Sequence, residues 1–141
     1  MFPSSSDPTA AYRKIGLETQ LDSASPHKLV IMLYDGALVA IANAQRHMEH
    51  KEIAEKGKAI SKAIDIIANG LQSSLDLDNG GEIGEQLEAL YEYMGKRLLH
   101  ANLRNDLAAL KEVSSLLQDL KSAWENIADD PAVLSPNSGG R

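Results

Sequence analysis

The feature that most constrains the fold is a helical repeat of apolar residues in four successive segments. In the second segment, apolar and small residues recur at alternating steps of four and three: Ile53, Gly57, Ile60, Ile64, Ile67, Leu71 and Ser74. An average step of about 3.5 residues is typical of helices that pack in left-handed bundles. No stretch alternates apolar and polar residues in the way that predicts a half-buried strand. The chain is therefore predicted to be all-α.

A first helix is predicted from about Pro26 to Glu49. Ser25 is a favourable N-cap residue, and proline suits the first helical position because its missing N–H would be unpaired there. Two adjoining sides of this helix are apolar: Leu29, Leu33, Ala37 and Ala40 on one, and Val30, Tyr34, Leu38 and Ile41 on the other. One buried stripe needs fewer apolar residues. The helix either lies at the centre of a bundle or also offers an apolar surface to a partner.

Turn signals divide the rest of the chain. Asp78-Asn79-Gly80-Gly81 predicts a turn after the second helix, and Asn105 or Asp106 can cap a fourth helix that ends before Asp129. The third helix, from Glu82 to Leu103, has the predicted inner stripe Ile83, Leu87, Leu90, Met94, Leu98 and Ala101, with Tyr91 and Leu99 off that stripe. The fourth has the stripe Leu107, Leu110, Val113, Leu117, Leu120, Trp124 and Ile127.

Four helices joined by short loops predict an antiparallel up-down four-helix bundle, which we place at residues 23–128. Residues 1–22 are predicted to be a mobile N-terminal segment. Part of it, around Tyr12 and Ile15, is apolar enough to dock on the bundle. Residues 129–141 are rich in proline, glycine and polar side chains, which predicts a disordered tail.

Composition excludes several classes of function. A net charge of −6 argues against nucleic acid as the main partner, because nucleic-acid binding needs a basic face. With no cysteine there is no disulfide framework and no thiolate metal site. We find no signal peptide and predict no membrane insertion, so the expected location is the cytosol.

The side chains that carry chemistry form no catalytic pattern. The Glu-x-x-His motif of metal-binding bundles is absent from the sequence, and so is a Gly-x-Ser-x-Gly nucleophile turn. His47 and His50 could share a metal by their spacing, but no third ligand is near them in sequence, and surface histidines are the better interpretation. We expect no enzymatic activity, no cofactor and no metal.

What exceeds the needs of a core is the number of apolar residues beside the main stripes. They are Met32, Leu38, Leu75, Leu77, Tyr91 and Leu99. A wide core explains any one of them about as well as a binding site does. Together they predict grooves between helices that accept an amphipathic segment of another chain, where methionine lets the surface adapt.

Four blocks in order resemble the flagellar secretion chaperones of the FliS family. They are SASPHKLVIMLYDGAL from Ser23, LQSSLDLDNGGEIGEQLEALYEYM from Leu71, RLLHANLRND from Arg97 and LLQDLKSAWE from Leu116. The resemblance implies an antiparallel four-helix bundle in the cytosol. It also implies binding of the disordered C-terminal segment of new flagellin, which prevents premature polymerisation, and delivery to the export gate of the flagellar type III secretion apparatus.

From the apolar surplus and this resemblance together, we predict the residues that contact flagellin. They are Tyr12, Ile15, Leu29, Met32, Gly36, Leu75, Leu77, Leu87, Tyr91, Met94, Leu98 and Asn102. The segment around Tyr12 matches the family's N-terminal tyrosine region, and we hypothesise that it is a lid over the binding surface. The alternative is a structural or regulatory bundle that forms a homodimer through the same apolar surface.

Overall fold

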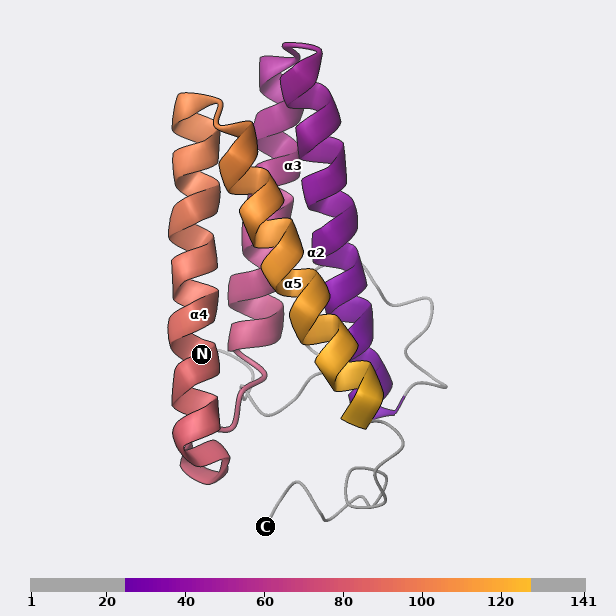
Figure 1. The fold of residues 1–141 in the computed structure, drawn as a ribbon, viewed down its shortest axis with the longest axis vertical. Coiled ribbons are helices and arrows are strands. Elements are labelled where there is room, and N and C mark those ends of the chain that lie inside the picture. Colours follow the sequence, from indigo (N-terminus) through magenta and orange to yellow (C-terminus); the bar gives the residue numbers. More distant parts are fainter. Residues whose placement is uncertain (1–24, 128–141) are drawn as a thin grey trace, which may run out of the picture.

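The computed structural model describes residues 25–127, which form an all-α antiparallel up-down bundle (Figure 1). Its elements are α2 (Pro26–Glu49), α3 (Ile53–Asp65), the π-helix η2 (Ile66–Gln72), α4 (Leu77–Arg104) and α5 (Leu107–Ile127). Because η2 continues α3, these residues make four helical rods without a strand, which confirms the predicted fold class. The predicted N-terminal segment and tail lie outside the described residues.

The start of α2 agrees with the sequence prediction. The Ser25 side chain accepts a hydrogen bond from the Lys28 N–H at 3.1 Å, and Pro26 occupies the first helical position. The Ser25 carbonyl accepts the first backbone bond of the helix, from Leu29 N–H at 2.9 Å. The N-cap and proline therefore fix the point at which the chain enters the bundle.

The α2 helix supplies much of the core because it packs against α3, η2 and α5. Its buried side chains are Leu29, Met32, Leu33, Tyr34, Ala37, Ala40, Ile41 and Ala44. This wide contact explains the apolar surplus of the helix. By length and composition α2 could also cross a membrane, but eight of its side chains are buried, as in the core helix of a bundle.

The second rod differs from the predicted continuous α-helix because η2 has π-helical turns. A π-turn bonds residue i to i+5 and widens the helix, so successive residues can share the inner side. Ile66 and Ile67 are both buried here, although only Ile67 lies on the predicted stripe. At the other end of the rod, Ile53 is 61% exposed rather than part of the core, because it lies in the first turn at the end of the bundle.

The third rod begins earlier than predicted, with a helical turn at Leu77. The expected break is nevertheless present at Gly81, whose φ of 59° and ψ of −143° are not helical. Glycine adopts a positive φ without the steric cost that a Cβ would bring. The main part of α4 therefore starts beside Glu82, where the sequence predicted it.

The inner side of α4 is rotated from the predicted one. Tyr91, which we placed off the stripe, is buried and its hydroxyl lies 2.6 Å from that of Tyr34 on α2. Ile83, which we placed on the stripe, is 69% exposed. The burial of Met94, Leu98 and Ala101 agrees with the prediction. The error at Ile83 follows from the course of α5, which leaves this end of α4 uncovered.

Candidate binding surfaces

Polar side chains join α5 to α4 near the turn between the two helices. There the Arg97 guanidinium Nε lies 2.8 Å from Glu112 Oε1, and the Tyr93 hydroxyl donates to the same carboxylate. The hydrogen bond from Tyr93, followed by the bond from Arg97, lowers the pKa of Glu112. The same hydrogen bond to Glu112, together with the negative charge of that carboxylate, raises the pKa of Tyr93. These contacts identify the side of each helix that faces the other.

The far end of α5 is held by α2 instead. Trp124 Nε1 donates to the His27 carbonyl at 3.3 Å, and the two rings stack with centroids 5.2 Å apart. Lys121 Nζ lies 2.6 Å from Asp35 Oδ1, which raises the pKa of that lysine. Figure 1 shows the result: α5 slants away from α4 along its length and ends beside the start of α2.

This divergence leaves an apolar surface on the sides of α4 and α5 that face each other. Ile83 and Leu90 follow the same side of α4 as Tyr93, and Leu116 and Leu120 follow the same side of α5 as Glu112, at steps of three and four residues. Ile83 and Ile127 are exposed, whereas the others are half-buried. We call this surface the α4–α5 face; it consists of Ile83, Leu87, Leu90, Leu116, Leu120 and Ile127.

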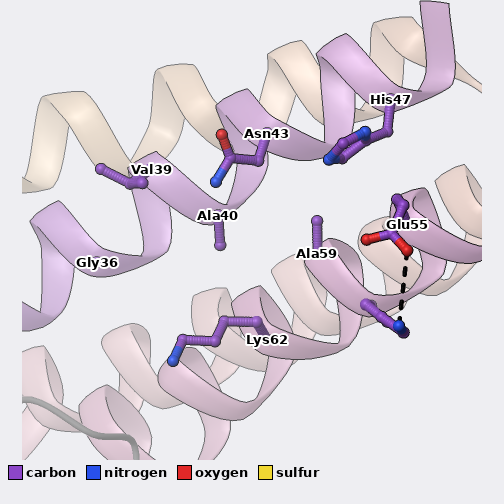
Figure 2. A pocket seen from close by; sticks show the side chains of 9 residues that line it. Gly36, Val39, Ala40, Asn43, His47, Glu55, Ala59 and Lys62 are labelled. Carbon is purple, nitrogen blue, oxygen red and sulfur yellow. Dashed lines mark ion pairs between the residues drawn. The ribbon is translucent and has the colours of Figure 1, made fainter. Parts of the chain in front are cut away.

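A second surface is a shallow groove of about 280 Å³ between α2 and α3 (Figure 2). The lining residues of this α2–α3 groove are Gly36, Val39, Ala40, Asn43, His47, Glu55, Lys58, Ala59 and Lys62. Small residues contribute to its floor, because Ala40 of α2 and Ala59 of α3 point into the space between the two helices (Figure 2). Glu55 and Lys58 form an ion pair of 3.6 Å at its rim. Such a groove admits an apolar side chain or a helix that approaches closely.

The structure does not bring the predicted contact residues together on one surface. Five of them are buried in the core: Leu29, Met32, Tyr91, Met94 and Leu98. Leu87 belongs to the α4–α5 face, Gly36 lines the α2–α3 groove, and Leu75 is half-buried against the core. The role of each in partner binding stays a prediction.

The remaining predicted residues lie at the ends of α4 or outside the described residues. Asn102 is half-buried near the end of α4, where its carbonyl accepts a hydrogen bond from Lys56 Nζ at 2.9 Å. Leu77 lies in the first turn of α4, and its side chain is not described. Tyr12 and Ile15 lie outside the described residues.

Sequence reasoning missed several residues of these surfaces. Val39, Asn43 and Ala59 line the α2–α3 groove, and Leu116 and Leu120 belong to the α4–α5 face. Periodicity assigned Leu120 to the core and gave no reason to expect that α5 crosses from one neighbour to another. The sequence shows that Leu116 follows Glu112 by four residues and so lies on the same side of the helix. That this side faces α4 is known only from the contacts of Glu112 with Arg97 and Tyr93.

Within residues 25–127, no three His, Cys, Asp or Glu side chains gather as metal ligands. His47 is instead bonded to Glu52 at 2.6 Å, which lowers the pKa of that carboxyl group. His100 lies 3.0 Å from Asp106, the residue that caps α5 through the Ala109 N–H. That backbone bond, followed by the contact with His100, lowers the pKa of Asp106. Both histidines therefore bond to carboxylates at the helix ends that form the two turns.

Residues 25–127 define an all-α four-helix-bundle protein with two partly uncovered surfaces. The chain belongs to the FliS family of flagellar proteins, whose sequence pattern it matches over residues 8–131. It is 48% identical to the flagellar secretion chaperone FliS of Salmonella typhimurium, over 84% of this chain and 87% of that protein. The proteins of the same name from Escherichia coli and Bacillus subtilis are 44% and 30% identical, over 89% and 95% of this chain and 93% and 96% of their own lengths.

Proposed function

We propose that this protein is a cytosolic, non-enzymatic export chaperone for flagellin. It binds the disordered C-terminal segment of flagellin, prevents its premature polymerisation and assists its delivery to the export gate of the flagellar type III secretion apparatus. Membership of a family whose relatives are named flagellar secretion chaperones supports a flagellar protein as the cargo. The observation that carries the proposal is the α4–α5 face, an uncovered edge of the core in a protein of that family.

The α4–α5 face is apolar and partly open to solvent. Ile83 is 69% exposed, and Leu90 and Leu120 are half-buried, so a chain laid between α4 and α5 would remove apolar surface from water. Each square ångström of apolar surface buried contributes about 25 cal/mol. A segment that orders on binding needs a long apolar contact to offset its lost conformational entropy. The α2–α3 groove provides a second contact for a segment that wraps around the bundle.

The direct test is titration of the protein with a peptide of the last ~40 residues of its flagellin, by calorimetry and size-exclusion chromatography. We expect a stable 1:1 complex. Ile83→Asp places a charge on the α4–α5 face and should weaken binding at least ~10-fold, since one contact commonly contributes 1.4 kcal/mol or more. Leu103→Asp, at a site on the opposite end of α4 that is also largely exposed, is the matched control. Equal binding by both variants would remove the α4–α5 face from the proposal.

The N-terminal segment around Tyr12 and Ile15 is proposed to cover the binding surface as a lid. If so, deletion of residues 1–18 should speed association with the flagellin peptide, because the peptide no longer competes with the lid. Stopped-flow mixing of the full and shortened chains measures this. Identical association rates would exclude the lid without affecting the chaperone proposal.

The homodimer alternative predicts a different result. A bundle that acts by self-association should elute as a dimer at micromolar concentration and show no complex with the flagellin peptide. Sedimentation velocity of the protein alone, and then with the peptide, separates the two functions.

A further inference from the structure

The two ends of the bundle carry opposite charge. Both tight turns, α2–α3 and α4–α5, lie at the same end, which we call the turn end (Figure 1). Residues 43–58 and 96–112, which form the turn end, hold eight Lys and Arg against five Asp and Glu. The other described residues hold three Lys and Arg against ten Asp and Glu. An acidic protein therefore has one basic end.

The last turns of α4 place apolar side chains in the middle of that basic end. Leu99 is 54% exposed and Leu103 is 80% exposed, and they follow each other on one side of the helix at a step of four. Lys96 precedes them on the same side, and Arg104 flanks them. Neither cation has an ion-pair partner within residues 25–127. We call these four residues, Lys96, Leu99, Leu103 and Arg104, the α4 ridge.

The last turn of α4, which carries Leu103 and Arg104 of the α4 ridge, is bonded to α3. Lys56 of α3 is only 3% exposed, and its Nζ donates to the Asn102 carbonyl at 2.9 Å and to Asn105 Oδ1 at 2.5 Å. The positive charge of Lys56 also complements the negative C-terminal end of the α4 helix dipole. Asn105, with a φ of 51°, forms the turn into α5. These bonds anchor the backbone at the last turn of α4, so binding to the ridge does not have to order that part of the chain.

We propose that the α4 ridge is a docking site for an acidic amphipathic helix of another protein. The leucine pair supplies the apolar contact of a helix-to-helix interface, and Lys96 and Arg104 select carboxylates beside the partner's apolar residues. Charge complementarity favours this occupant over a second copy, whose turn end would bring the same cations together. The ridge lies at the opposite end of α4 from Ile83, so a loaded chaperone still presents it. The inference does not depend on what the α4–α5 face binds.

The test uses a labelled peptide of about 18 residues, long enough to form a helix, with leucines on one side flanked by glutamates. A second peptide has lysine in place of each glutamate, and a third keeps the glutamates but has serine in place of each leucine. Fluorescence anisotropy measures binding to the full chain. We expect the first peptide to bind at least ~10-fold more tightly than either other peptide, which corresponds to about 1.4 kcal/mol. Raising salt from about 0.1 M to about 1 M should weaken it, as the Debye length falls from about 10 Å to about 3 Å.

Variants locate the binding. Leu99→Ser with Leu103→Ser should reduce affinity for the acidic peptide at least ~10-fold, and Lys96→Glu with Arg104→Glu should reverse the preference between acidic and basic peptides. Ile83→Ser, an exposed site on the α4–α5 face, is the matched control and should bind normally. Because all these side chains are exposed, unchanged thermal melts should accompany the losses.

Three outcomes would overturn the proposal. The first is absence of binding by the acidic peptide, or binding that the ridge variants leave unchanged. The second is binding to phosphatidylglycerol vesicles that needs the ridge while the peptide does not bind, which assigns the ridge to a membrane surface. The third is self-association in sedimentation that needs Leu99 and Leu103, which assigns it to a second copy. None of these affects flagellin binding, which the ridge variants should retain.

Discussion

At the scale of single residues, Tyr34 and Tyr91 join α2 to α4 by a hydrogen bond of 2.6 Å between their hydroxyl groups in the core. Both side chains are almost completely buried. A buried hydroxyl without a partner costs more than the bond itself contributes, so each tyrosine depends on the other. The pair therefore fixes how α4 is rotated against α2.

Replacing one member of the pair tests this dependence. Tyr34→Phe should lower the free energy of unfolding by about 1–3 kcal/mol, because it leaves the Tyr91 hydroxyl without its partner. The Tyr34→Phe, Tyr91→Phe double variant should lose less than the sum of the two single losses. Urea unfolding of the four proteins gives the coupling energy. Additive losses would show that the hydroxyls act independently.

The same pair predicts a dependence on alkaline pH. Burial raises the pKa of Tyr91 and of Tyr34, although the bond from Tyr91 opposes the rise at Tyr34. As the pH rises, the tyrosines of the unfolded chain lose their protons near the ordinary tyrosine pKa of about 10, whereas those of the folded chain keep them to higher pH. The contribution of the pair to stability is thus present below about pH 10 and lost above it. Between about pH 9 and 11 the wild type should lose more stability than the double phenylalanine variant.

Lys56 and Lys58 give a matched comparison on one helix. Lys56 is buried and bonded to the end of α4, whereas Lys58 is exposed and paired with Glu55 at 3.6 Å. Lys56→Met should destabilise the protein by about 1–3 kcal/mol, because it leaves the Asn102 and Asn105 oxygens without their donor. Lys58→Met should change stability by less than about 0.5 kcal/mol. Thermal and urea unfolding measure both, and equal effects would contradict the structural role of Lys56.

At the scale of elements, η2 lies against α2 through a glycine. A Cβ at Gly70 would lie 2.8 Å from Leu33 Cδ2, and Leu33 is completely buried in the core. A Cβ at Gly57 of α3 would meet nothing within 4 Å. The same chemical change is therefore predicted to have opposite effects at two points of one rod.

Gly57→Ala should stabilise the protein by up to about 1 kcal/mol, the difference in helix propensity between the two residues. Gly70→Ala should destabilise it by about 1–2 kcal/mol, because the strain of the overpacked contact exceeds that gain. Differential scanning calorimetry of both variants checks the signs. A stabilising Gly70→Ala would show that η2 can move away from α2 at little cost.

The sequence predicts the elements better than their relation to one another. Capping by Ser25 and Pro26 is local chemistry, and the α2 bounds agree with the prediction. The rotation that buries Tyr91 depends on a partner hydroxyl far along the chain. The exposure of Ile83 depends on the slant of α5, which Trp124 and Lys121 hold by contacts with α2. Periodicity contains no information on such crossings, and five of the twelve predicted contact residues lie in the core instead of on a surface.

At the scale of the whole molecule, α5 crosses from α4 to α2 (Figure 1), and the exposed Ile83 marks the open edge of the α4–α5 face. The charges divide along the same axis, with the basic turn end opposite the acidic end that carries Ile83. The two proposed binding surfaces lie at opposite ends of α4, which would allow a cargo and a second protein to bind at the same time. Substitutions at Ile83 and at Leu103 can test whether the two surfaces bind independently, because each changes one surface only.

If flagellin occupies the α4–α5 face as proposed, its binding should also lengthen the lifetime of the protein. A ligand that binds only the folded bundle adds about 2.7 kcal/mol to its stability at a hundredfold excess over Kd. The flagellin peptide should therefore raise the melting temperature of the wild type, and raise that of Ile83→Asp less, in a scanning fluorimetry titration. In the cell, proteases act on transiently unfolded chains. We expect unoccupied copies to be degraded faster than occupied ones, so that the supply of flagellin sets how much of this protein a cell retains.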